Sequence, residues 1–272
     1  MNAIRQTAMP PAMILCGGRG TRLMDVAELL PKPMVAIGEF PIVWHVMRSF
    51  AAFGVKRFIL CLGYKREAFV DYFVNYLTRT SDVTVSLNDN SKLKFHSGGQ
   101  PLDWEVTLAG TGLDSMTGCR VFRAAKYLAP DDRNFFLTYG DGVADINIEA
   151  LYRQHTKSGK LITISAVHPE ARFGEIVLDG NDVLRFDEKP PHASGYINGG
   201  YMMVERNFVA RYLADDESLF FERAPMRRAA EDHQMQVFKH EGFWQCMDNP
   251  REYELLNSLW RSGAAPWTKY WK

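Results

Sequence analysis

The feature that most constrains the fold is a glycine-rich loop that directly follows a short apolar run. Residues 13–16 are apolar, and three of the four residues 17–20 are glycine. The run predicts a buried strand, and the glycines predict a turn whose backbone passes very close to another group. Inward-pointing N–H groups and the positive end of a helix starting near Thr21 would form a phosphate site, to which Arg22 and Lys32 add charge. The alternative is a tight strand-to-helix turn without a ligand.

Strands and helices alternate along the first third of the chain. Apolar residues at helical spacing follow Pro41, and a continuous apolar run occupies residues 58–62. A second helix, with apolar residues on one face, is predicted over residues 69–77. This alternation predicts an α/β fold with a parallel, doubly wound sheet flanked by helices.

The pattern changes between residues 81 and 112, where apolar and polar residues alternate in three short runs separated by turn residues. We expect a meander of half-exposed antiparallel strands inserted into the α/β frame. The α/β rhythm then returns, without a repeat or a linker. A mixed sheet in one continuous domain is therefore the simplest account.

Charge and cysteine content exclude several classes of protein. The 32 basic and 32 acidic residues balance to a formal net charge of +0, which argues against nucleic acid or a membrane surface as a partner. The four cysteines lie far apart and form no C-x-x-C pair, which is typical of reduced thiols in a cytoplasmic protein. No stretch approaches transmembrane length, and the N-terminus does not read as a signal peptide. We therefore expect a soluble cytoplasmic protein.

Two aspartates follow predicted strands, where ligands bind in open α/β sheets. Asp141 stands between two glycines, and Asp248 follows the strand-like run over residues 243–247. Mg²⁺ prefers carboxylate oxygens together with substrate phosphates, so two aspartates at one phosphate loop would form a metal site. An Asp-Gly turn and a helix-capping aspartate remain alternatives, although Asn249 ahead of Pro250 is the more natural cap.

Two lysines beside prolines are further candidates. Lys32 has proline on both sides, and a stiff backbone lowers the entropy lost when its ammonium is aimed at an anion. Lys189 precedes two prolines and by itself predicts only a solvated loop charge. The glycine loop is neither a P-loop nor a dinucleotide fingerprint, because Thr21 stands where the first has lysine and Leu23 where the second has its last glycine.

Several ordered motifs resemble those of the sugar-1-phosphate nucleotidyltransferases. The general signature of that family is matched by residues 15–23 and 31–34. Further segments narrow the resemblance to the glucose-1-phosphate cytidylyltransferases: 41–47, 61–65, 81–84, 114–118, 138–145, 197–200 and 242–245. The likeness runs from about residue 13 to residue 267 and is far more specific than any single loop.

The resemblance implies a Rossmann-like α/β fold and a defined reaction. A cytidylyl group would pass from CTP to glucose 1-phosphate by metal-assisted in-line attack on the α-phosphate, giving CDP-glucose and pyrophosphate. The product would serve the synthesis of deoxysugar and surface polysaccharide precursors, as for O-antigen and lipopolysaccharide. The resemblance also implies Mg²⁺ as cofactor and a homo-oligomer. Residues 12–272 would form a single nucleotidyltransferase domain with an insertion at about 81–112, and residues 1–11 an N-terminal extension that we expect to be disordered.

The resemblance also implies roles for individual residues. The nucleotide would be bound by Leu15, Cys16, Gly17, Gly18, Arg19, Gly20, Thr21, Arg22, Lys32, Ser115, Arg120 and Gly140. The sugar phosphate would contact Gly174, Lys189 and Asn198, and the metal would be held by Asp141 and Asp248. Arg22, Lys32 and Asp141 would be the catalytic residues. The sequence departs from the family's pattern at Cys16, Arg19, Cys119 and Cys246, and none of these changes removes a charged catalytic position.

Three other functions stay open at this point. The same chemistry with UTP or GTP and a mannose or heptose phosphate is the nearest of them. A catalytically silent nucleotide-sugar-binding subunit is the second, and retention of Lys32, Asp141 and Asp248 argues against it. A glycosyltransferase of related fold is the third. It would normally carry a D-x-D metal motif, which residues 88–90 and 141–143 approach without matching.

Overall fold

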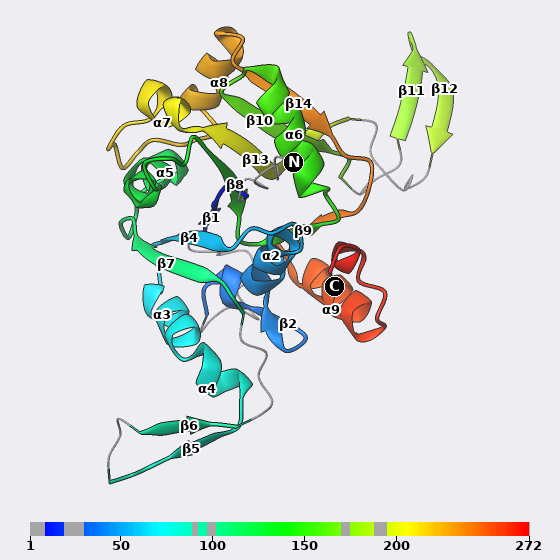
Figure 1. The fold of residues 1–272 in the computed structure, drawn as a ribbon. Coiled ribbons are helices and arrows are strands. Elements are labelled where there is room, and N and C mark those ends of the chain that lie inside the picture. The colour runs from blue at the N-terminus through cyan, green and yellow to red at the C-terminus, as the bar shows by residue number, and fades with distance from the viewer. Residues whose placement is uncertain are drawn as a thin grey trace, which may run out of the picture.

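A seven-stranded sheet runs through the centre of the computed structural model, which describes residues 9–18, 30–88, 92–96, 102–169, 175–187 and 195–271 (Figure 1). Its strand order is β14-β10-β13-β8-β1-β4-β7. These strands are β1 (Ala12–Leu15), β4 (Arg57–Leu62), β7 (Glu105–Gly110), β8 (Asn134–Tyr139), β10 (Ile162–Val167), β13 (Ile197–Glu205) and β14 (Met235–Lys239). Only β13 runs antiparallel to its neighbours in this sheet, so the predicted mixed, mostly parallel sheet is confirmed.

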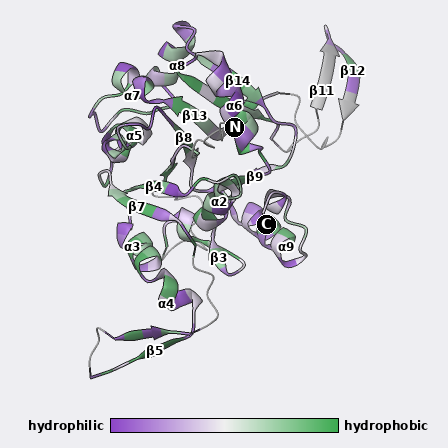
Figure 2. Cartoon of the chain, viewed as in Figure 1, coloured by the Kyte–Doolittle hydropathy of each residue, from purple (hydrophilic) through white to green (hydrophobic). Residues whose placement is uncertain are grey.

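Helices cover both faces of this sheet. One face packs against α2 (Ile42–Ala51), α3 (Arg66–Val74), α6 (Ile148–Ser158) and α9 (Pro250–Arg261), and the other against α5 (Thr117–Ala124), α7 (Arg206–Tyr212) and α8 (Ala224–Glu231). In β1, Ala12 and Ile14 join the first core, whereas Met13 and Leu15 join the second. A strand buried on both faces reads as a continuous apolar run, as this one does. A helix that covers the sheet is buried on one side only, so it carries both apolar and polar residues. Figure 2 shows both kinds of residue in α6.

The inserted meander is smaller than the sequence predicts. Its first two runs form a hairpin, β5 (Val83–Val85) with β6 (Leu93–Phe95), which extends away from the body in Figure 1. The third run is β7, which pairs parallel with β4 and forms an edge of the central sheet. The prediction for this run was wrong because an edge strand is only partly covered. It therefore shows the same apolar–polar alternation as a strand in an antiparallel meander.

Short elements complete the described chain. They are α4 (Tyr76–Thr80), the 3₁₀ turns η2 (Lys32–Met34), η3 (Ala125–Tyr127) and η4 (Pro266–Thr268), and the strand pairs β2 (Ala36–Ile37) with β3 (Phe40–Pro41), β9 (Gly142–Ala144) with β15 (Trp244–Cys246), and β11 (Glu175–Asp179) with β12 (Asp182–Asp187). The expectation for residues 1–11 falls mostly outside the described part. Within that part, each helix is too short or too polar to span a bilayer.

The C-terminal segment packs against α2 through aromatic side chains. The His45 ring is fully buried and lies among the rings of Trp260, Trp267 and Trp271, with centroids 4.7 to 6.0 Å away. Trp267 Nε1 donates to His45 Nδ1 at 3.3 Å, and His45 Nε2 donates to the Ile37 carbonyl at 2.9 Å. The tryptophan-rich tail is therefore part of the hydrophobic core of this chain.

Candidate active site

A cavity of about 420 Å³ lies at the carboxyl ends of β1 and β8. This is the position at which open α/β sheets bind their ligands. Its lining comes from five regions of the described chain: Leu15, Cys16, Gly17 and Gly18 at the end of β1; Lys32 and Pro33 in η2; Leu113, Asp114, Ser115, Met116, Thr117 and Arg120 before and within α5; Tyr139 and Asp141 at the end of β8; and Asp248 after β15. The cavity therefore brings together segments from both ends of the sequence.

Lys32, Asp141 and Asp248 meet at one wall of this cavity. The Lys32 amine donates a hydrogen bond of 2.6 Å to Asp141 Oδ2 and a second, shorter one to Asp248 Oδ1. The Lys32 side chain is only 10% exposed. Burial alone would lower its pKa, but the attraction of Asp141 and the hydrogen bonds to both carboxylates outweigh burial and raise the pKa. The amine is therefore a fixed positive charge inside the cavity.

A small two-stranded sheet explains why the two aspartates converge. Asp141 directly precedes β9, Asp248 follows β15, and these strands pair antiparallel with Cys246 opposite Gly142. The Met247 N–H extends the pairing by donating to the Asp141 carbonyl at 2.9 Å. Two carboxylates that are distant in sequence thereby reach one cation. Their oxygen donors, already gathered around an ammonium ion, fit a hard divalent cation such as Mg²⁺.

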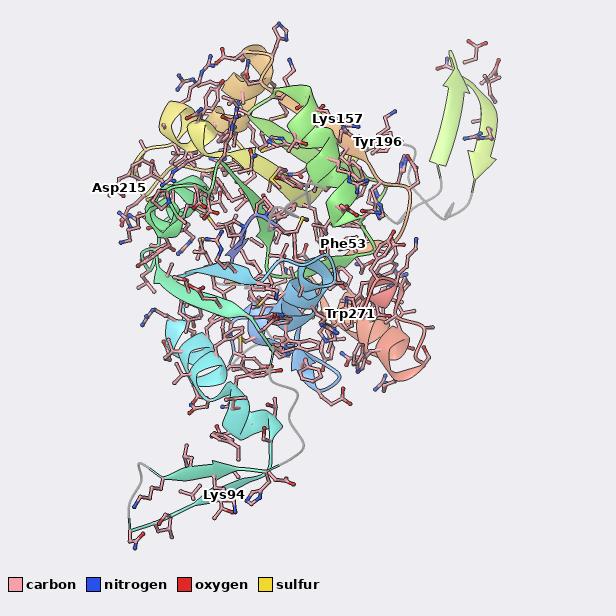
Figure 3. The ribbon with its side chains drawn as sticks, in the orientation of Figure 1. Phe53, Lys94, Lys157, Tyr196, Asp215 and Trp271 are labelled. Atoms are coloured by element: carbon pink, nitrogen blue, oxygen red, sulfur yellow. The ribbon has the colours of Figure 1, made fainter. Side chains whose placement is uncertain are left out.

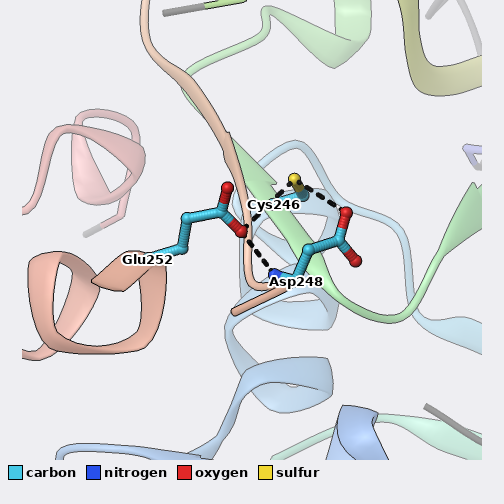
Figure 4. A group of neighbouring side chains, drawn as sticks. All are labelled: Cys246, Asp248 and Glu252. Carbon is cyan, nitrogen blue, oxygen red and sulfur yellow. Dashed lines mark hydrogen bonds between the residues drawn. The ribbon is translucent and has the colours of Figure 1, made fainter. Parts of the chain in front are cut away.

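The other side chains beside Asp248 are organised around the start of α9 (Figure 4). Glu252 Oε2 accepts the Asp248 N–H at 2.5 Å, and Asn249 Oδ1 accepts the Glu252 N–H at 3.0 Å. These contacts resemble a capping box and confirm Asn249 as the cap. The Asp248 carboxylate therefore does not cap the helix, and Asp248 lines the cavity. The Cys246 thiol lies 3.6 Å from Asp248 Oδ2, and burial together with nearby carboxylates raises its pKa to about 12. Mg²⁺ is a hard cation that prefers carboxylate oxygens to a soft sulfur ligand, so the aspartate oxygens suit it better than the Cys246 thiol.

The described glycines at the cavity have different surroundings. A Cβ on Gly17 would lie 2.2 Å from Arg120 Cζ, whereas one on Gly18 would meet no heavy atom within 4 Å. A Cβ on Gly140 would lie 2.9 Å from Cys16 Sγ and 3.1 Å from Pro33 Cβ. The missing side chain of Gly140 thus allows close packing of η2 against the end of β8, which places Lys32 beside Asp141. The other loop residues predicted to bind the nucleotide lie outside the described part of the chain. They are Arg19, Gly20, Thr21 and Arg22.

Ser115 and Arg120 line the cavity, as expected for nucleotide-binding residues, but their polar atoms have protein partners. Ser115 Oγ accepts a hydrogen bond of 2.9 Å from Arg123 Nη1. The Arg120 guanidinium donates to oxygens of several strand ends. Cys119 lies beside these residues and is one of the positions at which the sequence departs from the family's pattern. It is buried, and its thiol donates to Asp215 Oδ1 at 3.4 Å.

Of the residues predicted to bind the sugar phosphate, Asn198 lies in the described part, and Gly174 and Lys189 lie outside it. The Asn198 side chain is exposed and accepts the Gly200 N–H at 2.9 Å. A Cβ on Gly200 would be 2.6 Å from the Tyr139 ring, which lines the cavity. Asn198 itself is not among the cavity-lining residues, and it is connected to Tyr139 through the Gly200 backbone.

Six cavity residues were not predicted from the sequence. They are Pro33, Leu113, Asp114, Met116, Thr117 and Tyr139. Tyr139 OH donates to Glu222 Oε1 at 2.5 Å, and Thr117 Oγ1 donates to Glu222 Oε2 at 2.6 Å. The position of Tyr139 at a predicted strand end was the available signal. Pro33, Asp114, Met116 and Thr117 belong to segments whose motifs were noted, but only Lys32 and Ser115 were selected from those segments. Leu113 directly precedes one of them.

Comparison with known proteins identifies related chains. A family model described as nucleotidyl transferase matches residues 11–260. Glucose-1-phosphate cytidylyltransferase of Salmonella typhi is 41% identical over 261 residues, which cover 96% of this chain and 99% of that protein. Mannose-1-phosphate guanyltransferase of Aspergillus oryzae is 29% identical over 260 residues, which cover 93% of this chain and 65% of that protein.

A solved structure supports the fold. The crystal structure of HddC from Yersinia pseudotuberculosis superimposes with a TM-score of 0.64 at 22% sequence identity and covers 93% of this chain and 100% of that chain. At this identity the likeness bears on the fold, and it agrees with a mixed sheet flanked by helices.

Proposed function

The chain belongs to the nucleotidyl transferase family, and from this premise we propose that it transfers the cytidylyl group of CTP to glucose 1-phosphate. The products are CDP-glucose and pyrophosphate. The similarity to the Salmonella cytidylyltransferase supports this choice of substrates. The observation that carries the proposal is the cavity at the strand ends, in which the Lys32 amine lies between Asp141 and Asp248. Since CTP is a cytoplasmic nucleotide, we also infer that the chain acts in the cytoplasm.

The reaction needs alignment and charge stabilisation rather than a protein nucleophile. A phosphate oxygen of glucose 1-phosphate attacks the α-phosphorus of CTP, a new P–O bond forms, and the bond to the departing pyrophosphate breaks. Both substrates are anions, so the protein must hold them in line against their repulsion. The buried Lys32 amine supplies a fixed positive charge for this purpose, and in our proposal Arg22 adds a second.

We propose the same division of roles that the resemblance implied. Residues 15–22, Lys32, Ser115, Arg120 and Gly140 form the nucleotide site. Gly174, Lys189 and Asn198 contact the sugar phosphate. Residues 12–272 act as a single domain, of which the family model matches residues 11–260.

Enzymes of this family use a divalent metal ion, and we propose that it is Mg²⁺, held by Asp141 and Asp248. When bound, Mg²⁺ neutralises phosphate charge and polarises the α-phosphate. Binding of Mn²⁺ as a probe, measured by calorimetry, should be lost in Asp141→Asn and Asp248→Asn. It should be unchanged in Asp103→Asn, which alters an exposed aspartate paired with Lys56.

A grid of substrates tests the proposed reaction. Pyrophosphate release should be measured for CTP, UTP and GTP, each with glucose, mannose and heptose 1-phosphates, in the presence and absence of Mg²⁺. We expect the highest kcat/KM for CTP with glucose 1-phosphate. A higher value for another pair would assign the chain to that pair instead. Binding of CDP-glucose without turnover of any pair would point to a silent nucleotide-sugar-binding subunit.

We also propose that the chain forms a homo-oligomer through the β5–β6 hairpin. In Figure 3 the hairpin that carries Lys94 projects away from the rest of the chain. Leu87, Leu93 and Phe95 in this arm are 91%, 44% and 43% exposed. An isolated two-stranded hairpin is marginally stable in water, so burial against a second copy would stabilise it. Sedimentation should show that Leu93→Asp with Phe95→Asp lowers the molecular mass, whereas Val183→Asp with Leu184→Asp, exposed positions on β12, leaves it unchanged.

A further inference from the structure

The Arg120 guanidinium is buried at the wall of the cavity, and both of its terminal nitrogens are hydrogen-bonded. The residue is 4% exposed and belongs to α5. Its Nη1 donates to the Leu62 carbonyl at 3.2 Å, to Thr111 Oγ1 at 3.0 Å and to the Gly112 carbonyl at 2.7 Å. Its Nη2 donates to the carbonyls of Gly17 at 3.0 Å and Leu113 at 3.1 Å. Burial lowers the pKa of Arg120, yet a guanidinium remains charged at any ordinary pH.

The acceptors of these bonds lie at the ends of three adjacent parallel strands. Leu62 is the last residue of β4, Gly17 follows β1, and residues 111–113 follow β7. The helix α5, which carries Arg120, packs against β1 and β4. One side chain therefore fixes the relative positions of the glycine loop and of the segment that leads into Ser115. Both form walls of the cavity.

The bonds leave no terminal donor for a phosphate. Two terminal nitrogens carry four N–H groups, and the five protein oxygens above already share them. Recognition of a phosphate by arginine normally uses two parallel N–H groups of a free fork. In Arg120 the terminal N–H groups are directed at four backbone carbonyls and the Thr111 hydroxyl instead.

Two glycines leave the space that this guanidinium occupies. A Cβ on Gly17 would lie 2.2 Å from Arg120 Cζ, and a Cβ on Gly63 would lie 2.4 Å from Arg120 Nη1. Gly17 belongs to the loop expected to hold phosphate, but the group that its backbone approaches in the structure is Arg120. A methyl group at either position would have to displace a guanidinium that is held by several hydrogen bonds.

We propose that Arg120 is a positioning residue, which sets the shape of the nucleotide side of the cavity and makes no direct contact with the phosphates. This rests on the proposed function only for the identity of the nucleotide. The positioning role predicts that loss of the Arg120 bonds loosens residues 112–115 even in the ligand-free protein. It also predicts an equal loss of affinity for ligands with and without phosphate.

Arg120→Lys and Gly63→Ala test this role, with Gly110→Ala as the matched control. Gly110 ends the neighbouring strand β7, and a Cβ there would meet nothing closer than Arg66 Nε at 3.7 Å. Hydrogen exchange of the ligand-free proteins measures the amides of residues 112–115. Calorimetry measures the affinities for cytidine, CMP and CTP.

We expect faster exchange in Arg120→Lys and Gly63→Ala than in Gly110→Ala, and about tenfold weaker binding of all three ligands alike. Unchanged exchange would overturn the proposal, as would a loss for CTP at least ten times that for cytidine, which a phosphate contact predicts. If Arg120→Lys does not fold, Gly63→Ala decides, because it keeps the arginine and changes only its position. If the wild type binds no cytidine nucleotide, the proposed function fails, while the exchange data still decide the role of Arg120.

Discussion

At the scale of single residues, Lys32 combines burial, charge and position in the cavity. We expect Lys32→Ala to lower kcat by about 10²- to 10³-fold, because a preorganised positive charge would be lost from the reacting phosphates. The pyrophosphate-release assay measures this loss, and circular dichroism should show a folded protein. Lys56→Ala is the control, because Lys56 forms only an exposed ion pair with Asp103. Near-normal turnover of Lys32→Ala would contradict the role given to this amine.

Some residues that line the cavity could be singled out from the sequence because their local pattern is distinctive. Lys32 has flanking prolines, and Asp141 lies between glycines at a strand end. Their convergence with Asp248 could not be derived from spacing, because it depends on the pairing of β9 with β15. The partners of Arg120 were equally inaccessible, since Gly17 precedes it by 103 residues.

At the scale of elements, the cap at the start of α9 should stabilise the fold directly beside Asp248, which lines the cavity. Asn249→Ala should lower the free energy of unfolding by about 1 kcal/mol, because the Glu252 N–H loses its acceptor. Urea denaturation measures this change. Asn249→Asp keeps an oxygen acceptor at the cap and should retain most of the stability. Equal stability of the alanine and wild-type proteins would show that the cap contributes nothing.

Elements with strong periodicity were predicted well, and those defined by their pairing partners were not. The apolar runs of β1 and β4 and the helical spacing in α2 predicted the doubly covered sheet. The alternation of apolar and polar residues in β7 indicates that only one face of the strand is buried. An edge strand and a meander strand both have this property. Only the contact with β4 distinguishes the two.

At the scale of the whole molecule, the core on one face of the sheet buries two histidines, His45 in α2 and His155 in α6. His45 Nδ1 accepts from Trp267 and its Nε2 donates to Ile37, so a second ring proton would face another donor. His155 is 3% exposed, and its ring nitrogens lie 2.8 Å from Thr163 Oγ1 and 3.3 Å from Asn134 Oδ1. Burial lowers the pKa of each histidine from 6.5 to about 4.

These pKa values predict a loss of stability in mild acid. Between pH 6.5 and 4 the unfolded chain takes up protons on both histidines while the folded chain does not, so unfolding becomes more favourable as the pH falls. Each histidine should contribute a loss of about 3 kcal/mol over this window, and none above pH 7. Urea denaturation at a series of pH values measures the slope. His155→Gln should make that slope shallower than it is in the wild type. Identical slopes in the two proteins would mean that His155 is protonated equally in the folded and unfolded states, despite its burial.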